Sequence, residues 1–154
     1  MAALSLGCAG RIDHPSGSRS ALVLTVVHHP EDARIRQRQI NALITAGWKV
    51  TYVAPFHAFG LEVPPPRSDD LGRGGLWCIN IARSSGRRRF RAWRAARTMM
   101  RALGQDHDVV LVHDPELVLA AAGLGMQNLI WDVHEDPAAA LREALTMILA
   151  RDHA

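Results

Sequence analysis

The stretch ALVLTVVHHPEDARIRQRQINALITAG, residues 21–47, carries the strongest fold signal in this chain. Residues 21–27 form a Val- and Leu-rich run that is too short for a helix, which is typical of a strand buried on both faces. In residues 31–46 the aliphatic side chains fall within one half of a helical wheel: Ile35, Ile40, Leu43 and Ile44. Gly47 is placed to end that helix. A buried strand followed by an amphipathic helix indicates one β–α unit of a parallel sheet.

The rest of the chain repeats this alternation. Further strands are predicted at residues 48–54, 76–82, 108–112 and 128–133, with a Pro- and Gly-rich surface loop at residues 57–75. Helices are predicted at residues 87–103, from Glu116, and from Pro137, with Asp136 as a cap. Alternating strands and helices predict a single Rossmann-like α/β domain over residues 21–154. We expect a parallel sheet of about five strands in the order 3-2-1-4-5, with helices on both faces.

Composition fits one globular domain. The chain has 154 residues, of which 48% are hydrophobic, and a net charge of +3. No stretch approaches the roughly 20 apolar residues of a membrane span, and residues 1–20 predict a disordered tail rather than a signal peptide. Cys8 and Cys78 have neither metal-site nor disulfide spacing. We therefore expect a cytoplasmic protein.

Three polar clusters stand where predicted strands end. Their titratable residues are His28, His29, Asp32 and Arg34 after the first strand, His113 and Asp114 after the fourth, and Asp132, His134 and Glu135 at the end of the fifth. In an open parallel sheet, ligands bind outside the carboxyl ends of the strands, near the point where strand order reverses. That point lies between the first and fourth strands here, so we expect one site built from the three clusters.

Simpler interpretations stay open for some of these residues. Asp32 and Asp136 each precede a predicted helix, where a carboxylate caps free amide groups. His28 and His29 are also compatible with loop imidazoles that bond the backbone. Donor atoms for a metal are present in the clusters, but no paired spacing fixes their geometry, so we predict no metal site. A Gly-x-Ser-x-Gly nucleophile elbow does not occur.

Four ordered motifs carry a family resemblance: HHPEDARI at residues 28–35, GWKV at 47–50, HDPEL at 113–117 and DVHE at 132–135. The chain from about Leu22 to Asp136 resembles the amino-terminal domain of family 4 retaining glycosyltransferases. These enzymes have the GT-B fold, with two Rossmann domains and the reaction in the cleft between them. The amino-terminal domain mainly shapes the acceptor site, and the other domain holds the nucleotide-sugar. The resemblance does not extend to that donor-binding domain, so we expect a truncated amino-terminal domain.

The resemblance implies roles for the cluster residues. His134 would hydrogen-bond the transferred sugar near the reaction centre, with Asp132 or Glu135 holding its ring. The acceptor side would be lined by His28, His29, Asp32, Arg34, His113 and Asp114. No cofactor is implied, because the nucleotide-sugar is a co-substrate. The first loop lacks the Gly-Gly turn of many relatives, which argues against close backbone approach to a phosphate there.

A basic segment contains no acidic residue between Arg83 and Arg101. On the wheel of the predicted helix, one half is apolar or aromatic, and the other half holds arginines: Arg87, Arg88, Arg91, Arg94, Arg97 and Arg101. A simple structural interpretation is a crossover helix that packs on the sheet through its apolar half and keeps its arginines in solvent. Such a face also attracts anionic lipid. Nucleic acid fits less well, because Phe90 and Trp93 fall on the apolar half and leave no stacking platform.

The sequence supports two function classes. The first is one half of a retaining glycosyltransferase, which uses a sugar acceptor and works with a separately encoded donor-binding domain. The second is a non-catalytic remnant or binding module for a partner or an anionic membrane surface. A stand-alone nucleotide-binding domain is the weakest alternative, because no G-x-G-x-x-G turn is present.

Overall fold

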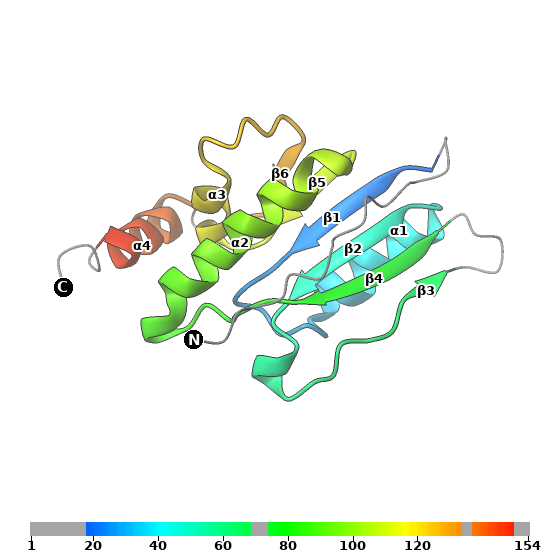
Figure 1. Ribbon diagram of the computed structural model, residues 1–154, viewed down its shortest axis with the longest axis horizontal. Coiled ribbons are helices and arrows are strands. Elements are labelled where there is room, and N and C mark those ends of the chain that lie inside the picture. Colours follow the sequence, from blue (N-terminus) through cyan, green and yellow to red (C-terminus); the bar gives the residue numbers. More distant parts are fainter. Residues whose placement is uncertain (1–17, 69–73, 134–136, 150–154) are drawn as a thin grey trace.

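The computed structural model describes residues 18–68, 74–133 and 137–149. Its centre is a sheet of six strands in the order β3-β4-β2-β1-β5-β6 (Figure 1). The parallel strands are β1 (Ser20–Leu24), β2 (Lys49–Ala54), β4 (Gly75–Asn80), β5 (Val109–Val112) and β6 (Leu129–Trp131). These five strands confirm the predicted order, and the order reverses between β1 and β5.

One strand was not predicted. β3 (Arg67–Ser68) pairs antiparallel with β4 at the edge of the sheet, within the stretch predicted to be a loop. A strand of two residues has no alternation of apolar and polar side chains, and the sequence therefore carries no signal for it.

Two helical layers cover the sheet, as predicted (Figure 1). One face carries α2 (Arg89–Leu103), which follows the 3-10 turn η3 (Gly86–Arg88), and α3 (Pro115–Ala121). The opposite face carries η1 (Ala33–Ile40) and α1 (Asn41–Thr45). Short 3-10 turns, η2 (His57–Phe59) and η4 (Gly104–Asp106), follow β2 and α2, and α4 (Pro137–Leu149) packs beside α3.

The alternation of β1 side chains creates two separate cores. Leu22 and Leu24 point to the α2–α3 face, where Ala96 and Met100 are buried against them. Val23 points to the other face, among the side chains of η1 and β2. Because successive residues of a strand point to opposite faces, a central strand needs apolar residues at every position.

The first helix is predicted in the right place, but most of it is a π-helix. The sequence predicted a helix over residues 31–46; η1 is a π-helix, and α1 continues it. A π-helix closes i→i+5 hydrogen bonds, so residues five apart share a side. Ile35 and Ile40 are consequently both buried. The helix ends at Gly47, which has a φ of 82°, and the Trp48 N–H donates to Leu43 O at 2.9 Å.

The predicted tail lies mostly outside the described residues, apart from Ser18, Arg19 and Ser20, the first residue of β1. Asp136, the predicted cap of the last helix, is also outside them. Within the described residues, the structure contains no helix with both the length and the apolar character needed to cross a membrane.

Candidate functional site

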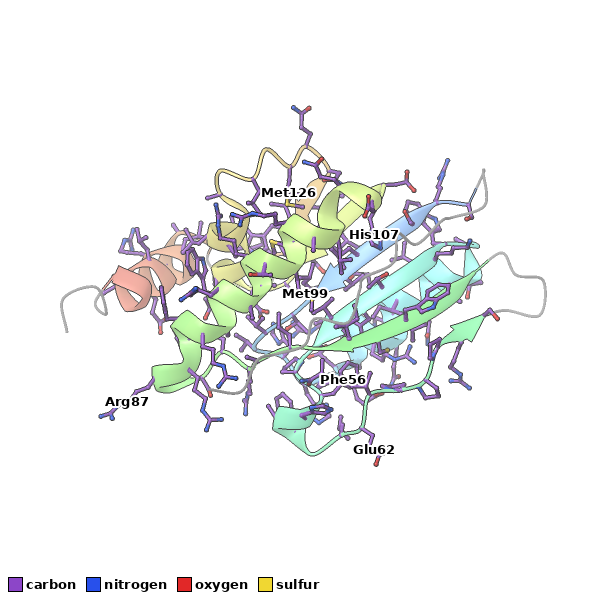
Figure 2. All side chains as sticks on the ribbon, viewed as in Figure 1. Phe56, Glu62, Arg87, Met99, His107 and Met126 are labelled. Atoms are coloured by element: carbon purple, nitrogen blue, oxygen red, sulfur yellow. The ribbon has the colours of Figure 1, made fainter. Side chains whose placement is uncertain are left out.

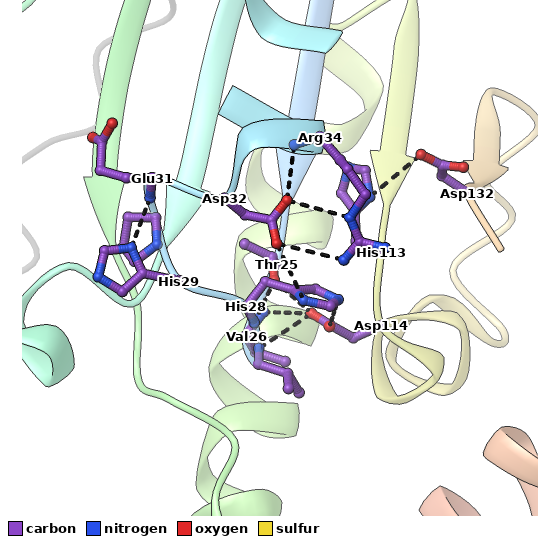
Figure 3. Close-up of polar contacts among 12 residues, drawn as sticks. Thr25, Val26, His28, His29, Glu31, Asp32, Arg34, His113, Asp114 and Asp132 are labelled. Carbon is purple, nitrogen blue, oxygen red and sulfur yellow. Dashed lines mark hydrogen bonds and ion pairs between the residues drawn. The ribbon is translucent and has the colours of Figure 1, made fainter. Parts of the chain in front are cut away.

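The carboxyl ends of β1, β5 and β6 bring members of the three polar clusters together at the point where strand order reverses (Figure 3). Two networks form there. The first joins His28 and Asp32 to Asp114, and the second joins His113 to Asp132. His134 and Glu135, predicted to act at the reaction centre, lie outside the described residues.

Asp114 is the buried anchor of the first network. Its Oδ2 accepts hydrogen bonds from Thr25 Oγ1 at 2.9 Å, Val26 N at 2.6 Å and Val27 N at 3.3 Å. Its Oδ1 lies 3.3 Å from His28 Nε2. Burial raises the pKa of Asp114, while the hydrogen bonds from Val26 and Thr25 and the charge of His28 oppose that rise. Asp114 therefore holds the loop after β1 against the end of β5.

Asp32 both caps the following helix and faces the site. Its Oδ1 accepts the Arg34 N–H at 2.9 Å, and its two carboxylate oxygens each lie 3.4 Å from a guanidinium nitrogen of Arg34. Partial burial raises the pKa of Asp32, but the hydrogen bonds and charge of Arg34 outweigh it and hold that pKa below its usual value. Asp32 Oδ2 lies 4.0 Å from His28 Nδ1. His28 thus stands between two carboxylates, one partly exposed to solvent and one buried.

The second network contains a residue that the sequence did not predict. Gln39, on η1, donates from Nε2 to Asp132 Oδ2 at 3.3 Å, and its Oε1 lies 2.9 Å from His113 Nε2. Because the amide nitrogen faces a carboxylate, Oε1 must be the acceptor, and His113 Nε2 carries the proton. His113 Nδ1 lies 3.6 Å from Asp132 Oδ2. A lone glutamine on a polar helix face has no sequence signal of function, and the π-helical turn decides where it points.

Burial separates the residues that hold the site from those that can touch a ligand. His113 and Asp114 are only 5% and 1% exposed. The side chains of His28, Asp32, Arg34 and Asp132 keep between 20% and 45% of their surface in solvent. The geometry therefore gives His113 and Asp114 a positioning role and leaves contact with any ligand to the accessible four.

His29 does not join either network. Its Nδ1 accepts the Glu31 N–H at 3.1 Å (Figure 3). Its ring meets Phe59 edge-on, with centroids 4.6 Å apart. His28 and His29 are adjacent in sequence, but their side chains point to different neighbours.

A further buried acid, Glu116, stands beside this centre. It is 3% exposed and accepts a hydrogen bond from Ser84 Oγ at 3.0 Å. Arg89 Nη1 lies 3.9 Å from both Glu116 and Glu143 of α4. Among the described residues, no group of three or more His, Cys, Asp or Glu side chains is arranged to hold a metal ion.

The arginine face on η3 and α2 is partly as predicted. Arg87, Arg88, Arg91, Arg94 and Arg101 are exposed, and Arg87 projects from the start of the α2 segment (Figure 2). We call these five residues the arginine face. Arg97 was expected to belong to it, but its Nη1 donates to Ala120 O at 2.8 Å and Ala122 O at 2.6 Å. It satisfies carbonyls at the carboxyl end of α3, where a cation also complements the helix dipole.

Replacing Arg97 by alanine should therefore lower stability by about 2 kcal/mol, because hydrogen bonds from a charged donor contribute about 1.5–3 kcal/mol. Chemical denaturation measures this loss. Arg91→Ala is the matched control, since Arg91 is exposed on the same helix and such surface changes stay within about 0.5 kcal/mol. Equal stability of the two variants would show that the Arg97 contacts contribute nothing.

Comparison of this chain with family models, curated proteins and solved structures finds no match.

Proposed function

We propose that this chain is the acceptor-side domain of a retaining glycosyltransferase similar to family 4. One observation carries the proposal: His28, Asp32 and Asp132 come from motifs far apart in sequence, and they gather as accessible side chains at the switch point of a parallel sheet. Imidazole, carboxylate and guanidinium groups there are suited to hydrogen-bonding sugar hydroxyls.

The division of labour follows from burial. His28, Asp32 and Arg34 would bind the acceptor, and Asp132, two positions before His134 in the sequence, would face the reaction centre. Asp114 would hold His28 in place, and Gln39 with His113 would hold Asp132. Developing charge at the sugar needs prepositioned dipoles, and side chains fixed by such networks supply them without reorganisation.

A saccharide screen by NMR tests this proposal. We expect mono- and disaccharides that bind the chain to shift the amide signals of residues 28–34 and 132. His28→Ala should abolish those shifts, whereas Arg101→Gln, at the far end of α2, should leave them unchanged. Shifts confined to other surfaces, or no response to any saccharide, would contradict an acceptor site and favour the non-catalytic alternative.

The chain alone should neither transfer nor hydrolyse sugar from common nucleotide-sugars. In the enzymes it resembles, the donor is held by a second domain, and holding reacting groups in register is worth roughly 7–11 kcal/mol of the barrier. A coupled assay for nucleotide release, with isothermal titration against the same nucleotide-sugars, checks this. Turnover by the purified chain that disappears in His134→Ala would refute the expectation.

The arginine face supports a second proposal, peripheral binding to anionic membrane. Among the described residues, this face makes no ion pair with an acid, and each basic residue close to an anionic surface contributes about 1 kcal/mol. The half-buried Phe90 and Trp93 rings stack on the same helix, with centroids 5.6 Å apart. Arg94 of the arginine face lies 6.0 Å from the centroid of Phe90, so this apolar ring adjoins the basic residues, an arrangement that suits a headgroup region.

We expect the chain to bind vesicles that contain phosphatidylserine or phosphatidylglycerol, but not neutral vesicles. Arg91→Gln with Arg94→Gln should weaken this binding about thirty-fold, which corresponds to about 1 kcal/mol for each residue. A control that removes two exposed arginines elsewhere, Arg38→Gln with Arg67→Gln, should have little effect. The measurement is co-sedimentation with vesicles at rising salt concentration. Vesicle affinity that does not change with salt would contradict electrostatic binding through the arginine face.

A further inference from the structure

Arg83 stacks on an aromatic ring at the carboxyl edge of the sheet. Its guanidinium carbon lies 4.3 Å from the centroid of Phe59, and the ring of His29 meets Phe59 edge-on. Phe59 follows β2, His29 follows β1, and Arg83 follows β4. These three residues, which we call the Arg83 cluster, lie beside the candidate site and belong to neither of its two networks.

The backbone fixes each part of the Arg83 cluster. The η2 turn that carries Phe59 is tied to β4, since His57 N donates to Asn80 Oδ1 at 2.9 Å. The segment with Arg83 crosses the carboxyl ends of two strands, because Ile81 N donates to Ala54 O at 3.1 Å and Ser84 N to Val26 O at 2.7 Å. The guanidinium is therefore presented by an ordered segment rather than by a free loop.

The charge of Arg83 has no counterpart among the described residues. No carboxylate in that part of the chain pairs with it, and its Nε is buried with no hydrogen-bond partner there. A buried donor without an acceptor costs free energy, which an ion or a water at that position removes. A guanidinium that stacks on a ring keeps its in-plane N–H groups for a planar or tetrahedral oxyanion.

His29 adds a second donor to the same cluster. Because Nδ1 accepts the Glu31 N–H, the proton of the neutral ring sits on Nε2. His29 is exposed, so this donor is available to a ligand. The Phe59 ring contacts both the Arg83 guanidinium and the His29 ring, and an apolar neighbour of this kind strengthens a charged hydrogen bond.

We propose that Arg83, with Phe59 and His29, forms a binding site for an oxyanion, either a phosphate or a carboxylate. The Arg83 cluster lies at the same edge of the sheet as the proposed acceptor residues. The ligand is therefore expected to be a small molecule that binds at this edge and carries an anionic group. The proposal stands without any transfer reaction, because it concerns binding alone.

Side-chain NMR of the full chain tests it directly. We expect inorganic phosphate or acetate, titrated at constant ionic strength with chloride as the balancing ion, to shift the Arg83 Nε–H signal. Arg83→Gln should weaken the affinity about ten-fold, the loss expected for one charge-assisted hydrogen bond. Arg83→Lys, which keeps the charge and removes the planar fork, should also weaken it.

Arg87→Gln is the matched control, since it removes one exposed positive charge nearby in sequence and should change the affinity less than two-fold by the same scale.

A stronger response to phosphate than to acetate assigns a phosphate ligand, and the reverse assigns a carboxylate. If Arg83→Gln fails to fold, the affinity of Arg83→Lys and the shift of the Arg83 Nε–H signal in the unchanged chain still test the site. An Arg83 signal unmoved by either anion, or equal losses in the Arg83 and Arg87 variants, would overturn the site, while the saccharide screen reports separately on the acceptor proposal.

Discussion

Replacing Asp114 by alanine should lower the free energy of unfolding by about 3–5 kcal/mol, the range seen when one partner of a buried charged network is removed. The change leaves Thr25 Oγ1 and the N–H groups of Val26 and Val27 without their acceptor, and His28 without its buried carboxylate. Each unsatisfied buried group costs about 1–3 kcal/mol. Denaturant unfolding gives the loss, and Asp106→Ala, at an exposed aspartate, is the control. A loss below that of the control would mean that the network does not hold β1 to β5.

The same carboxylate should give stability a specific pH dependence. Because burial raises the pKa of Asp114, the folded chain holds this proton more tightly than the unfolded chain, whose aspartates titrate at about 3.9. The contribution of Asp114 to stability is then complete below the unfolded pKa and is lost as pH rises through the folded pKa. Asp114→Asn keeps one acceptor oxygen and cannot titrate.

The difference in stability between the parent and Asp114→Asn should therefore shift toward the variant as pH rises above about 4. His28 and Glu116 also face Asp114, and both residues are present in the parent and in the variant, so taking the difference reduces their contribution. Unfolding curves over this pH range measure the effect. A difference that moves toward the parent as pH rises would show that the hydrogen bonds from Val26 and Thr25 outweigh burial.

Met100→Ala should cost about 2–5 kcal/mol, as for other large apolar side chains removed from a core. Met100 is 1% exposed and packs between α2 and the sheet. It also borders a half-open pocket of about 230 Å³ that Leu124 and Met126 line as well, so truncation extends this pocket into the core instead of letting the site collapse. Met99→Ala is the matched control, because Met99 is the neighbouring residue and stays partly exposed. Thermal and chemical denaturation should both rank Met100 above Met99, and the opposite ranking would mean that the helix packs through a different stripe.

Local patterns were sufficient for the order of the elements. A short apolar run such as residues 21–27 favours a buried strand, and β1 occupies Ser20–Leu24. Gly47 ends the helix that follows because it adopts a positive φ at no steric cost. Short right-handed connections then leave few arrangements of five parallel strands. The same patterns located the end of β5 at Val112, but they placed the ends of β1 and β6 two to three residues too late, since these strands end at Leu24 and Trp131.

Side-chain direction required the tertiary structure. Helical wheels assumed 3.6 residues per turn, but η1 is a π-helix, which changes the side on which Gln39 lies. Arg97 belonged to the basic half of the wheel, yet it lies close enough to α3 to cap it. A helical wheel describes one helix, and the neighbour that each side reaches is set by packing.

The two adjacent histidines show what the sequence determines and what only the tertiary structure decides. The sequence by itself determined that His28 and His29 stand at the end of a central strand, because hydrophobic periodicity is a local property of the chain. The structure decided that His28 meets Asp114 from 86 positions further on, while His29 turns to Phe59. Such pairs depend on strand order and on the space left by neighbouring side chains, which are properties of the packed molecule and not of any one segment.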